Sequence, residues 1–145
     1  MKLRTGDPWM PAADYGRSLR GLTINLLVED VAATLQFQTR VLRTEVVYQD
    51  PDFEVVRGYD AEWMFHADHT YEHHPFATLV ASSAPGGRGR GVELRLHGCD
   101  PDAAERAATE LGYVVIGPAR DKPHGLRESF IADSDGYVWV PDVPT

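Results

Sequence analysis

Residues 91–140 read GVELRLHGCDPDAAERAATELGYVVIGPARDKPHGLRESFIADSDGYVWV, and this stretch decides the fold. Residues 92–97 alternate apolar and polar side chains, as a half-buried strand does. Asp100 and Pro101 open a helix that ends at Gly112. Three further strands are predicted over 113–116, 126–132 and 137–140. The stretch is therefore a β-α-β-β-β unit, which leaves one face of its half-sheet uncovered.

The first half of the chain repeats this order. Strands are predicted over 22–28, 45–49, 53–59 and 62–66, and a helix over 30–42. An internal repeat constrains a fold more strongly than a single motif, because one unit cannot bury its apolar face alone. The predicted fold class is α+β, with two paired β-α-β-β-β modules that form a cupped mixed sheet with helices on the outside.

The repeat and two motifs resemble the vicinal oxygen chelate superfamily, which holds glyoxalase I, extradiol dioxygenases and bleomycin-resistance proteins. The first motif is Val28-Glu29-Asp30, before the first helix, and the second is Gly125-Leu126-Arg127-Glu128 leading to Asp133-Ser134-Asp135-Gly136-Tyr137. The resemblance covers roughly residues 20–141. It implies the fold but leaves the activity open, because the superfamily contains enzymes and pure binding proteins.

Composition divides the chain into an N-terminal arm and one domain. Residues 1–19 are polar and rich in Gly and Pro, which predicts an irregular arm. Residues 20–145 are expected to form a single domain, with module one at 20–74, a linker at 75–90 and module two at 91–141. Trp9 and Tyr15 are expected to pack on the domain's own surface, and covering a partner subunit is the alternative.

Charge and cysteine content exclude several classes of protein. The net charge of −8 and the isoelectric point of about 5.1 argue against a nucleic-acid partner, which would require a basic patch. The single cysteine, Cys99, forbids an internal disulfide. We find no signal peptide and no apolar stretch long enough to span a bilayer, so we expect a cytoplasmic protein without a membrane partner.

The resemblance implies four positions for metal ligands, on the first and last strand of each half. In this sequence they fall on Thr23, Met64, Glu93 and Val140. Only Glu93 is a competent ligand for a divalent ion, and a catalytic metal needs about three protein ligands. We therefore expect no metal or other cofactor. A shifted site made of Asn25, His66 and Glu93 is the alternative.

Four histidines, at positions 66, 69, 73 and 74, lie close together in the sequence. Their spacing suggests a metal site, but His66 and His69 fall on opposite sides of an extended strand. We therefore favour the interpretation that His69 and His73 cap or brace the link after the strand.

Side-chain alternation predicts which residues line the cleft. In the strands at 22–28 and 92–97 the apolar residues take the even positions, so Thr23, Asn25, Glu93 and Arg95 should face away from the helices. The segment 121–128 is polar and turn-rich, which suits ligand contacts on a loop. The predicted ligand-binding residues are Asn25, Met64, His66, Glu93, Arg95, His124 and Arg127, with Arg127 at the mouth of the cleft. The alternative for Glu93 and Arg95 is a simple bridge across a solvated sheet.

These features favour a metal-free binding protein that resembles bleomycin-resistance proteins and sequesters a small, partly aromatic compound. Such antibiotic-resistance proteins need aromatic side chains and a few polar contacts in the cleft. The alternative is a glyoxalase-type lyase or isomerase that uses the shifted metal site or a Glu93/His66 acid–base pair. The resemblance also implies a homodimer, since family members commonly pair to complete the cleft.

Overall fold

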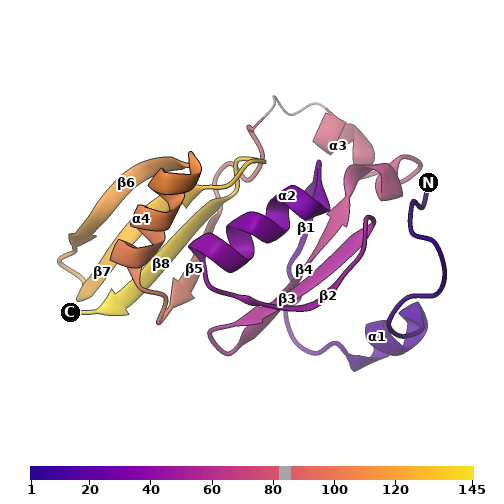
Figure 1. Cartoon of the computed structure of the whole chain (residues 1–145), viewed down its shortest axis with the longest axis horizontal. Coiled ribbons are helices and arrows are strands. Elements are labelled where there is room, and N and C mark those ends of the chain that lie inside the picture. Colours follow the sequence, from indigo (N-terminus) through magenta and orange to yellow (C-terminus); the bar gives the residue numbers. More distant parts are fainter. Residues whose placement is uncertain (82–85) are drawn as a thin grey trace.

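The computed structural model describes residues 1–81 and 86–145, so part of the predicted linker at 75–90 lies outside the described residues. The described residues form two four-stranded sheets, with strand orders β1-β4-β3-β2 and β5-β8-β7-β6 (Figure 1). The elements of module one are β1 (Asn25–Val28), α2 (Val31–Gln36), the π-helical turn η1 (Phe37–Val41), β2 (Glu45–Gln49), β3 (Phe53–Gly58) and β4 (Ala61–Ala67). Those of module two are β5 (Glu93–His97), α4 (Pro101–Leu111), β6 (Val114–Asp121), β7 (Leu126–Ala132) and β8 (Val138–Pro144).

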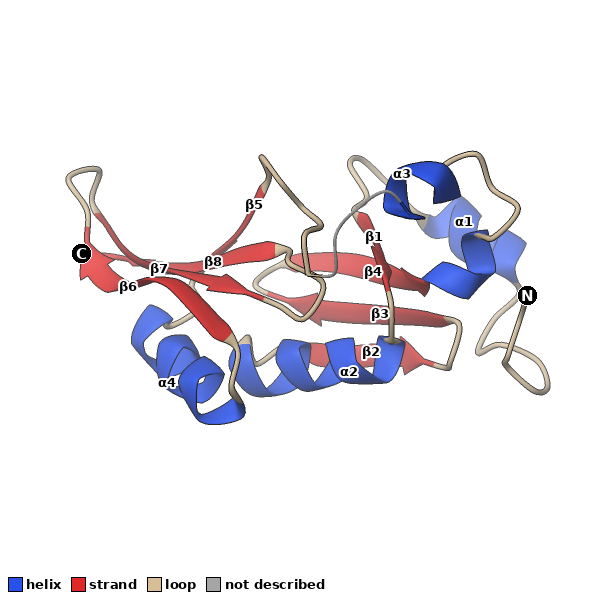
Figure 2. Ribbon diagram, turned by 90° about the horizontal axis from the view of Figure 1, so that it is seen from above, coloured by secondary structure: helices blue, strands red, loops and turns tan. Residues whose placement is uncertain are grey.

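Strand pairing confirms the internal repeat. In each module the first strand pairs in parallel with the last, β1 with β4 and β5 with β8. The remaining neighbours pair antiparallel. Figure 2 shows the sheets side by side, with α2 and α4 on one side of them. The predicted α+β fold of two β-α-β-β-β modules is therefore confirmed, and we call the sheet face away from α2 and α4 the cup face.

The two main helices begin with the same local device. The carboxylate of Asp30 accepts hydrogen bonds from the backbone of Ala32 and Ala33, at 2.8 and 3.3 Å. The carboxylate of Asp100 caps α4 in the same way. Such a cap satisfies N–H groups that have no partner within the helix. The cap therefore starts both helices at the position expected from the sequence.

The core lies between the sheets and α2 and α4. Val28, Phe65 and Leu94 belong to it, as the alternation of strand residues predicts, and Trp139 of β8 belongs to it as well. One part of that prediction is wrong: β1 begins at Asn25, so the predicted strand at 22–28 starts three residues later. Leu22 and Ile24, expected under the helices, are 91% and 36% exposed. These two residues precede the ladder, whose first pair joins Asn25 of β1 to Met64 of β4.

The two motifs from the sequence meet where the modules join. The backbone N–H of Glu29 donates to the Asp135 carboxylate at 2.9 Å, and the Tyr137 hydroxyl donates to the Leu27 carbonyl at 2.8 Å. Arg88 donates to the same carbonyl at 2.8 Å and forms an ion pair with Asp68. The turn at 133–136 thus holds the second module against the end of β1.

The N-terminal arm is not irregular throughout, because it contains the helix α1 (Ala12–Ser18). Pro11 stands at the N-cap and Asp14 lies in the first turn, where a carboxylate favours helix formation. None of the α1 residues is buried. Figure 2 shows α1 and α3 (Ala77–Ala81) over the cup face of module one, opposite α2. The short 3-10 turn η2 (Asp68–Tyr71) connects β4 to this region.

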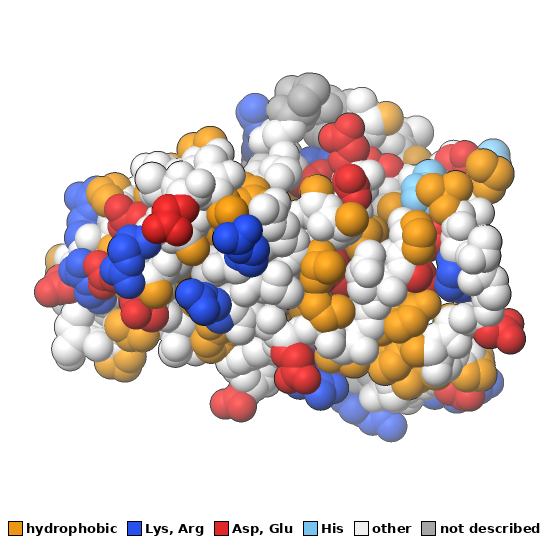
Figure 3. Space-filling model, in the orientation of Figure 1, with side chains coloured by type: hydrophobic (Ala, Val, Ile, Leu, Met, Phe, Trp, Pro, Cys, Tyr) orange, Lys and Arg blue, Asp and Glu red, His pale blue; other side chains and the backbone are white. Residues whose placement is uncertain are grey.

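The surface over the helices carries charges of both signs. Figure 3 shows acidic and basic side chains intermixed over module two on the face that carries α4. Within residues 1–81 and 86–145, no helix has the length and apolar character needed to cross a membrane.

Candidate functional site

The arm and the cup face of module one line a half-open pocket of about 530 Å³, which we call the module-one chamber. Cavities of roughly 300–1,000 Å³ with mainly apolar walls are typical of small-molecule sites. The larger side chains that line it include Trp9, Met10, Tyr15, Phe53, Met64 and His66. The chamber therefore combines aromatic and thioether walls from the arm and from the sheet.

His66 is the imidazole in the wall of the chamber. Its Nδ1 lies 2.8 Å from Asn25 Oδ1, and the Asn25 amide donates to the Tyr71 hydroxyl at 3.0 Å. Because the amide nitrogen of Asn25 is the donor to Tyr71, its oxygen accepts from His66 Nδ1–H, which leaves Nε2 as an acceptor. Burial lowers the pKa of His66, against a weaker opposing effect of Asp50. His66 is therefore a neutral hydrogen-bond acceptor near neutral pH.

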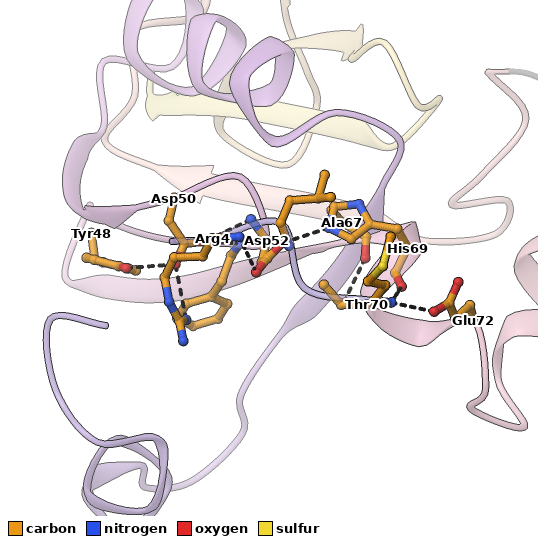
Figure 4. Close-up of polar contacts among 11 residues, drawn as sticks. Arg4, Tyr48, Asp50, Asp52, Ala67, His69, Thr70 and Glu72 are labelled. Carbon is orange, nitrogen blue, oxygen red and sulfur yellow. Dashed lines mark hydrogen bonds and ion pairs between the residues drawn. The ribbon is translucent and has the colours of Figure 1, made fainter. Parts of the chain in front are cut away.

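Asp52 attaches the beginning of the arm to the sheet (Figure 4). Its carboxylate accepts from the backbone N–H groups of Leu3 and Arg4 at 2.7 and 3.1 Å. His69 Nε2 lies 2.7 Å from the same carboxylate. Burial raises the pKa of Asp52, but the hydrogen bonds from His69, Leu3 and Arg4 outweigh this effect and lower it. The buried charge of Asp52 is thus satisfied by the arm together with His69.

Aromatic contacts hold the middle of the arm. Trp9 stacks on Tyr48 with ring centroids 5.4 Å apart and an interplanar angle of 12°. Tyr15 meets Phe53 edge-on at 5.7 Å. Trp9 and Tyr15 therefore pack on the domain's own surface, as the favoured interpretation of the sequence predicts.

A second polar group, the module-two charge cluster, lies on the cup face of module two. It consists of Glu93, Arg95, His97, His124, Glu128 and Asp142. The Arg95 guanidinium donates to Glu93 at 3.0 Å, to Asp142 at 3.2 Å and to Glu128. His97 pairs with Asp142 at 2.7 Å and His124 with Glu128 at 3.2 Å. The bridge between Glu93 and Arg95, named as the alternative, is thus present.

The predicted ligand-binding residues fall into two groups rather than one. Asn25, Met64 and His66 gather at the module-one chamber. Glu93, Arg95 and His124 gather in the module-two charge cluster, where Arg95 and His124 share the Glu128 carboxylate. The groups belong to different sheets, so the convergence of all these side chains in one cup is not found within one chain.

Arg127 does not lie at the mouth of the cup, and this placement was wrong. Its guanidinium donates to Asp102 of α4 at 2.6 Å and to Asp121 at 3.0 Å. Alternation along β7 places Arg127 on the same face as Ile131, a core residue, while Glu128 faces the cup. Arg127 therefore connects β7 to α4.

The family model of the Glyoxalase/Bleomycin resistance protein/Dioxygenase superfamily matches residues 22–140. The chain belongs to this superfamily. No protein of curated function matches the chain.

Solved structures with the same fold are distant in sequence. A glyoxalase/bleomycin resistance protein/dioxygenase family enzyme from Burkholderia phytofirmans PsJN is 16% identical, with a TM-score of 0.68, and the match covers 85% of this chain and 97% of the Burkholderia chain. A glyoxalase-related enzyme from Fulvimarina pelagi is 16% identical, with a TM-score of 0.66 and coverage of 86% and 87%. The fosfomycin resistance protein FosX from Listeria monocytogenes is 16% identical, with a TM-score of 0.61 and coverage of 88% and 95%. At these identities the similarity shows the fold alone.

The four positions that the resemblance assigns to metal ligands carry a poor ligand set in this chain. Thr23 precedes β1, Met64 lies in the chamber wall and Val140 is fully buried. The Glu93 carboxylate is paired with Arg95 at 3.0 Å. A catalytic zinc site requires about three strong nitrogen, oxygen or sulfur ligands. Among residues 1–81 and 86–145 there is also no group of three or more His, Cys, Asp or Glu side chains arranged to hold a metal ion.

The four histidines at 66–74 each contact a different residue. His66 binds Asn25 and His69 binds Asp52, which agrees with a bracing role for His69. His73 is 94% exposed beside Glu72, and His74 accepts from the backbone of Phe76 at 3.0 Å. The expected bracing role of His73 is not seen, because its side chain points to solvent.

Sequence reasoning missed three contributors to these sites. Asp52 was not singled out, although an Asp-Pro-Asp turn before a strand often accepts backbone N–H groups. Glu128 and Asp142 were also missed, although both fall on the cup face by alternation. Their burial, 3% and 0% exposed, is a property of the folded sheet.

Proposed function

We propose that this superfamily member is a metal-free binding protein that sequesters a small, partly aromatic compound in the module-one chamber. The observation that carries the proposal is the neutral His66 acceptor set among aromatic and thioether side chains in a pocket of about 530 Å³. Such walls bind by burial of apolar area and ring stacking, and one polar group orients the ligand.

The superfamily supports an antibiotic or a similar natural compound as the ligand. Its name includes bleomycin resistance proteins, and FosX is a fosfomycin resistance protein. The four metal positions carry a poor ligand set, so no divalent cofactor is included in the proposal. A protein that only sequesters its ligand needs no reacting group in the pocket. This agrees with the state of His66, whose Nδ1–H already donates to Asn25.

The alternative, a glyoxalase-type lyase or isomerase, is less well supported. Its acid–base pair requires Glu93 close to His66. Within one chain, His66 is held by Asn25 in the first sheet and Glu93 by Arg95 in the second. The contacts of these two residues therefore favour binding over proton transfer.

A homodimer in the cytoplasm, without a nucleic-acid partner, completes the proposal. Val114 and Ile116 of the edge strand β6 are 64% and 58% exposed. Apolar side chains on an edge strand invite pairing with a second copy, and a two-fold axis is the usual symmetry. Sedimentation of the protein at tens of micromolar should show a dimer.

Two measurements test the binding function. Metal analysis of protein purified without a histidine tag should find less than about 0.1 equivalent of Zn, Ni, Fe or Mn, since the ligand set is poor. A thermal-shift screen with bleomycin, fosfomycin and aromatic compounds should find stabilising ligands, whose effect Met64→Ala or His66→Leu removes. Stoichiometric metal with turnover of a 2-oxoaldehyde adduct would overturn the proposal.

A further inference from the structure

The start of the arm is attached through backbone hydrogen bonds, whereas the segment beyond it is attached through aromatic side chains. Asp52 holds the backbone of Leu3 and Arg4, and Asp52 itself is only 3% exposed. In contrast, α1 has no buried residue and Trp9 is 40% exposed. Residues 7–20 are thus held mainly by ring contacts of partly exposed side chains, and a segment of this kind opens locally at a low free energy.

Glycines with positive φ flank this segment. Gly6 has a φ of 82° and Gly21 a φ of 61°. No heavy atom lies within 4 Å of the position where a Cβ would stand on either residue. Glycine adopts positive φ without the steric strain that a Cβ would cause, and open space around it permits a change of its backbone angles. We call residues 7–20, between these glycines, the flap.

The flap supplies one wall of the chamber and the sheet supplies the other. Trp9, Met10 and Tyr15 come from the flap, whereas Phe53, Met64 and His66 come from β3 and β4. The rings of Trp9 and Tyr15 are 5.7 Å apart, and Tyr15 contacts Phe53. A planar ring that enters the chamber would therefore contact aromatic side chains from the flap and the sheet.

The polar chemistry of the chamber restricts the ligand further. His66 donates from Nδ1 to Asn25, so its Nε2 accepts from a ligand hydroxyl or N–H. A buried acceptor favours a ligand that carries a matching donor, because burial without a partner costs free energy on both sides. The complementary ligand is thus a flat aromatic compound with a hydroxyl or N–H group that donates to His66.

Resting on the proposed function, we propose that the flap is a movable part of the binding site. It opens at Gly6 and Gly21 to admit a planar aromatic hydrogen-bond donor, and it closes so that Trp9 and Tyr15 contact the ligand and determine its specificity. Asp52 keeps the start of the arm in place while the flap moves.

The test uses 2-naphthol, which has one hydroxyl donor, and 2-methoxynaphthalene, which has none, in calorimetric titrations of the whole chain. Trp9→Ala should weaken 2-naphthol binding about tenfold, the usual scale for one aromatic contact. Phe76→Ala, at an exposed aromatic residue that does not line the chamber, is the control and should leave affinity unchanged. His66→Leu should remove the preference for 2-naphthol over its methyl ether.

Limited trypsin digestion reports the flap itself. Arg17 and Arg20 are exposed, so cleavage after them measures the accessibility of the flap, and saturating 2-naphthol should slow it several-fold.

The outcomes separate the flap from the binding function. Loss of affinity in His66→Leu with full affinity in Trp9→Ala would refute the flap and leave the binding function intact. Equal affinity in the wild type and both variants would refute both, since the naphthol would bind elsewhere. No binding at about 1 mM would refute the ligand class, and the thermal-shift screen would then decide the binding function separately.

Discussion

Replacement of Glu54 by Gln should stabilise this protein at alkaline pH. Glu54 lies on β3 between Gln49 of β2 and Phe65 of β4, and it is 0% exposed. Among the described residues, neither of its carboxylate oxygens has a hydrogen-bond partner. Burial raises the pKa of Glu54 from 4.5 to about 8, because the charged form cannot be solvated there.

The sign and size of the effect follow from proton linkage. Above about pH 4.5 the unfolded chain releases the Glu54 proton, whereas the folded protein keeps it up to about pH 8. The free energy of unfolding therefore falls as the pH rises through this window. At about 1.4 kcal/mol per pKa unit, the loss above pH 8 is about 5 kcal/mol.

Glutamine resembles the protonated carboxyl group but does not titrate, so Glu54→Gln should match the wild type near pH 4.5 and exceed it increasingly above that pH. Thermal unfolding at about pH 9 should show a Tm increase of about 10–20 °C for a domain of this size. Glu45→Gln, at an exposed position on β2, serves as the control and should change little. Parallel stability curves for the wild type and Glu54→Gln from about pH 5 to about pH 9 would refute the reasoning.

Three other substitutions test separate parts of the structure. Asp52→Asn should accelerate trypsin cleavage after Arg4 by loosening the start of the arm, at a cost of about 1–3 kcal/mol, and an unchanged rate of cleavage there would contradict the attachment. Arg95→Met should lower the free energy of unfolding in urea by about 2–3 kcal/mol, because the buried carboxylates of Glu128 and Asp142 lose their cation, and an unchanged midpoint would count against the cluster. Arg127→Ala should lower thermal stability slightly and leave 2-naphthol affinity unaltered, since Arg127 pairs with Asp102 on the helix side; a loss of affinity would return Arg127 to the binding site.

Local signals in the sequence were sufficient for the architecture. Asp30 and Asp100 predict where their helices begin, because a capping carboxylate binds backbone N–H groups only two or three residues away. Alternation along β4 and β5 assigned Met64, His66, Glu93 and Arg95 to the cup face, since successive strand side chains point to opposite faces. The repeat of this pattern was then enough to predict two β-α-β-β-β modules, and the family match over residues 22–140 confirms the superfamily.

The composition of the sites depended on contacts between residues far apart in the chain. The pairing of His66 with Asn25 spans 41 positions, and the attachment of Leu3 to Asp52 spans 49. Only the packing of the arm on the first sheet created the chamber, and only the relative position of the two sheets separated Glu93 from His66. The isolation of Glu54 likewise arises from burial, which one strand cannot reveal because it depends on what the helices cover. The sequence by itself thus determined the elements, their order and the faces of the strands, whereas the tertiary structure alone decided which side chains meet, because such contacts depend on how separate elements pack in space.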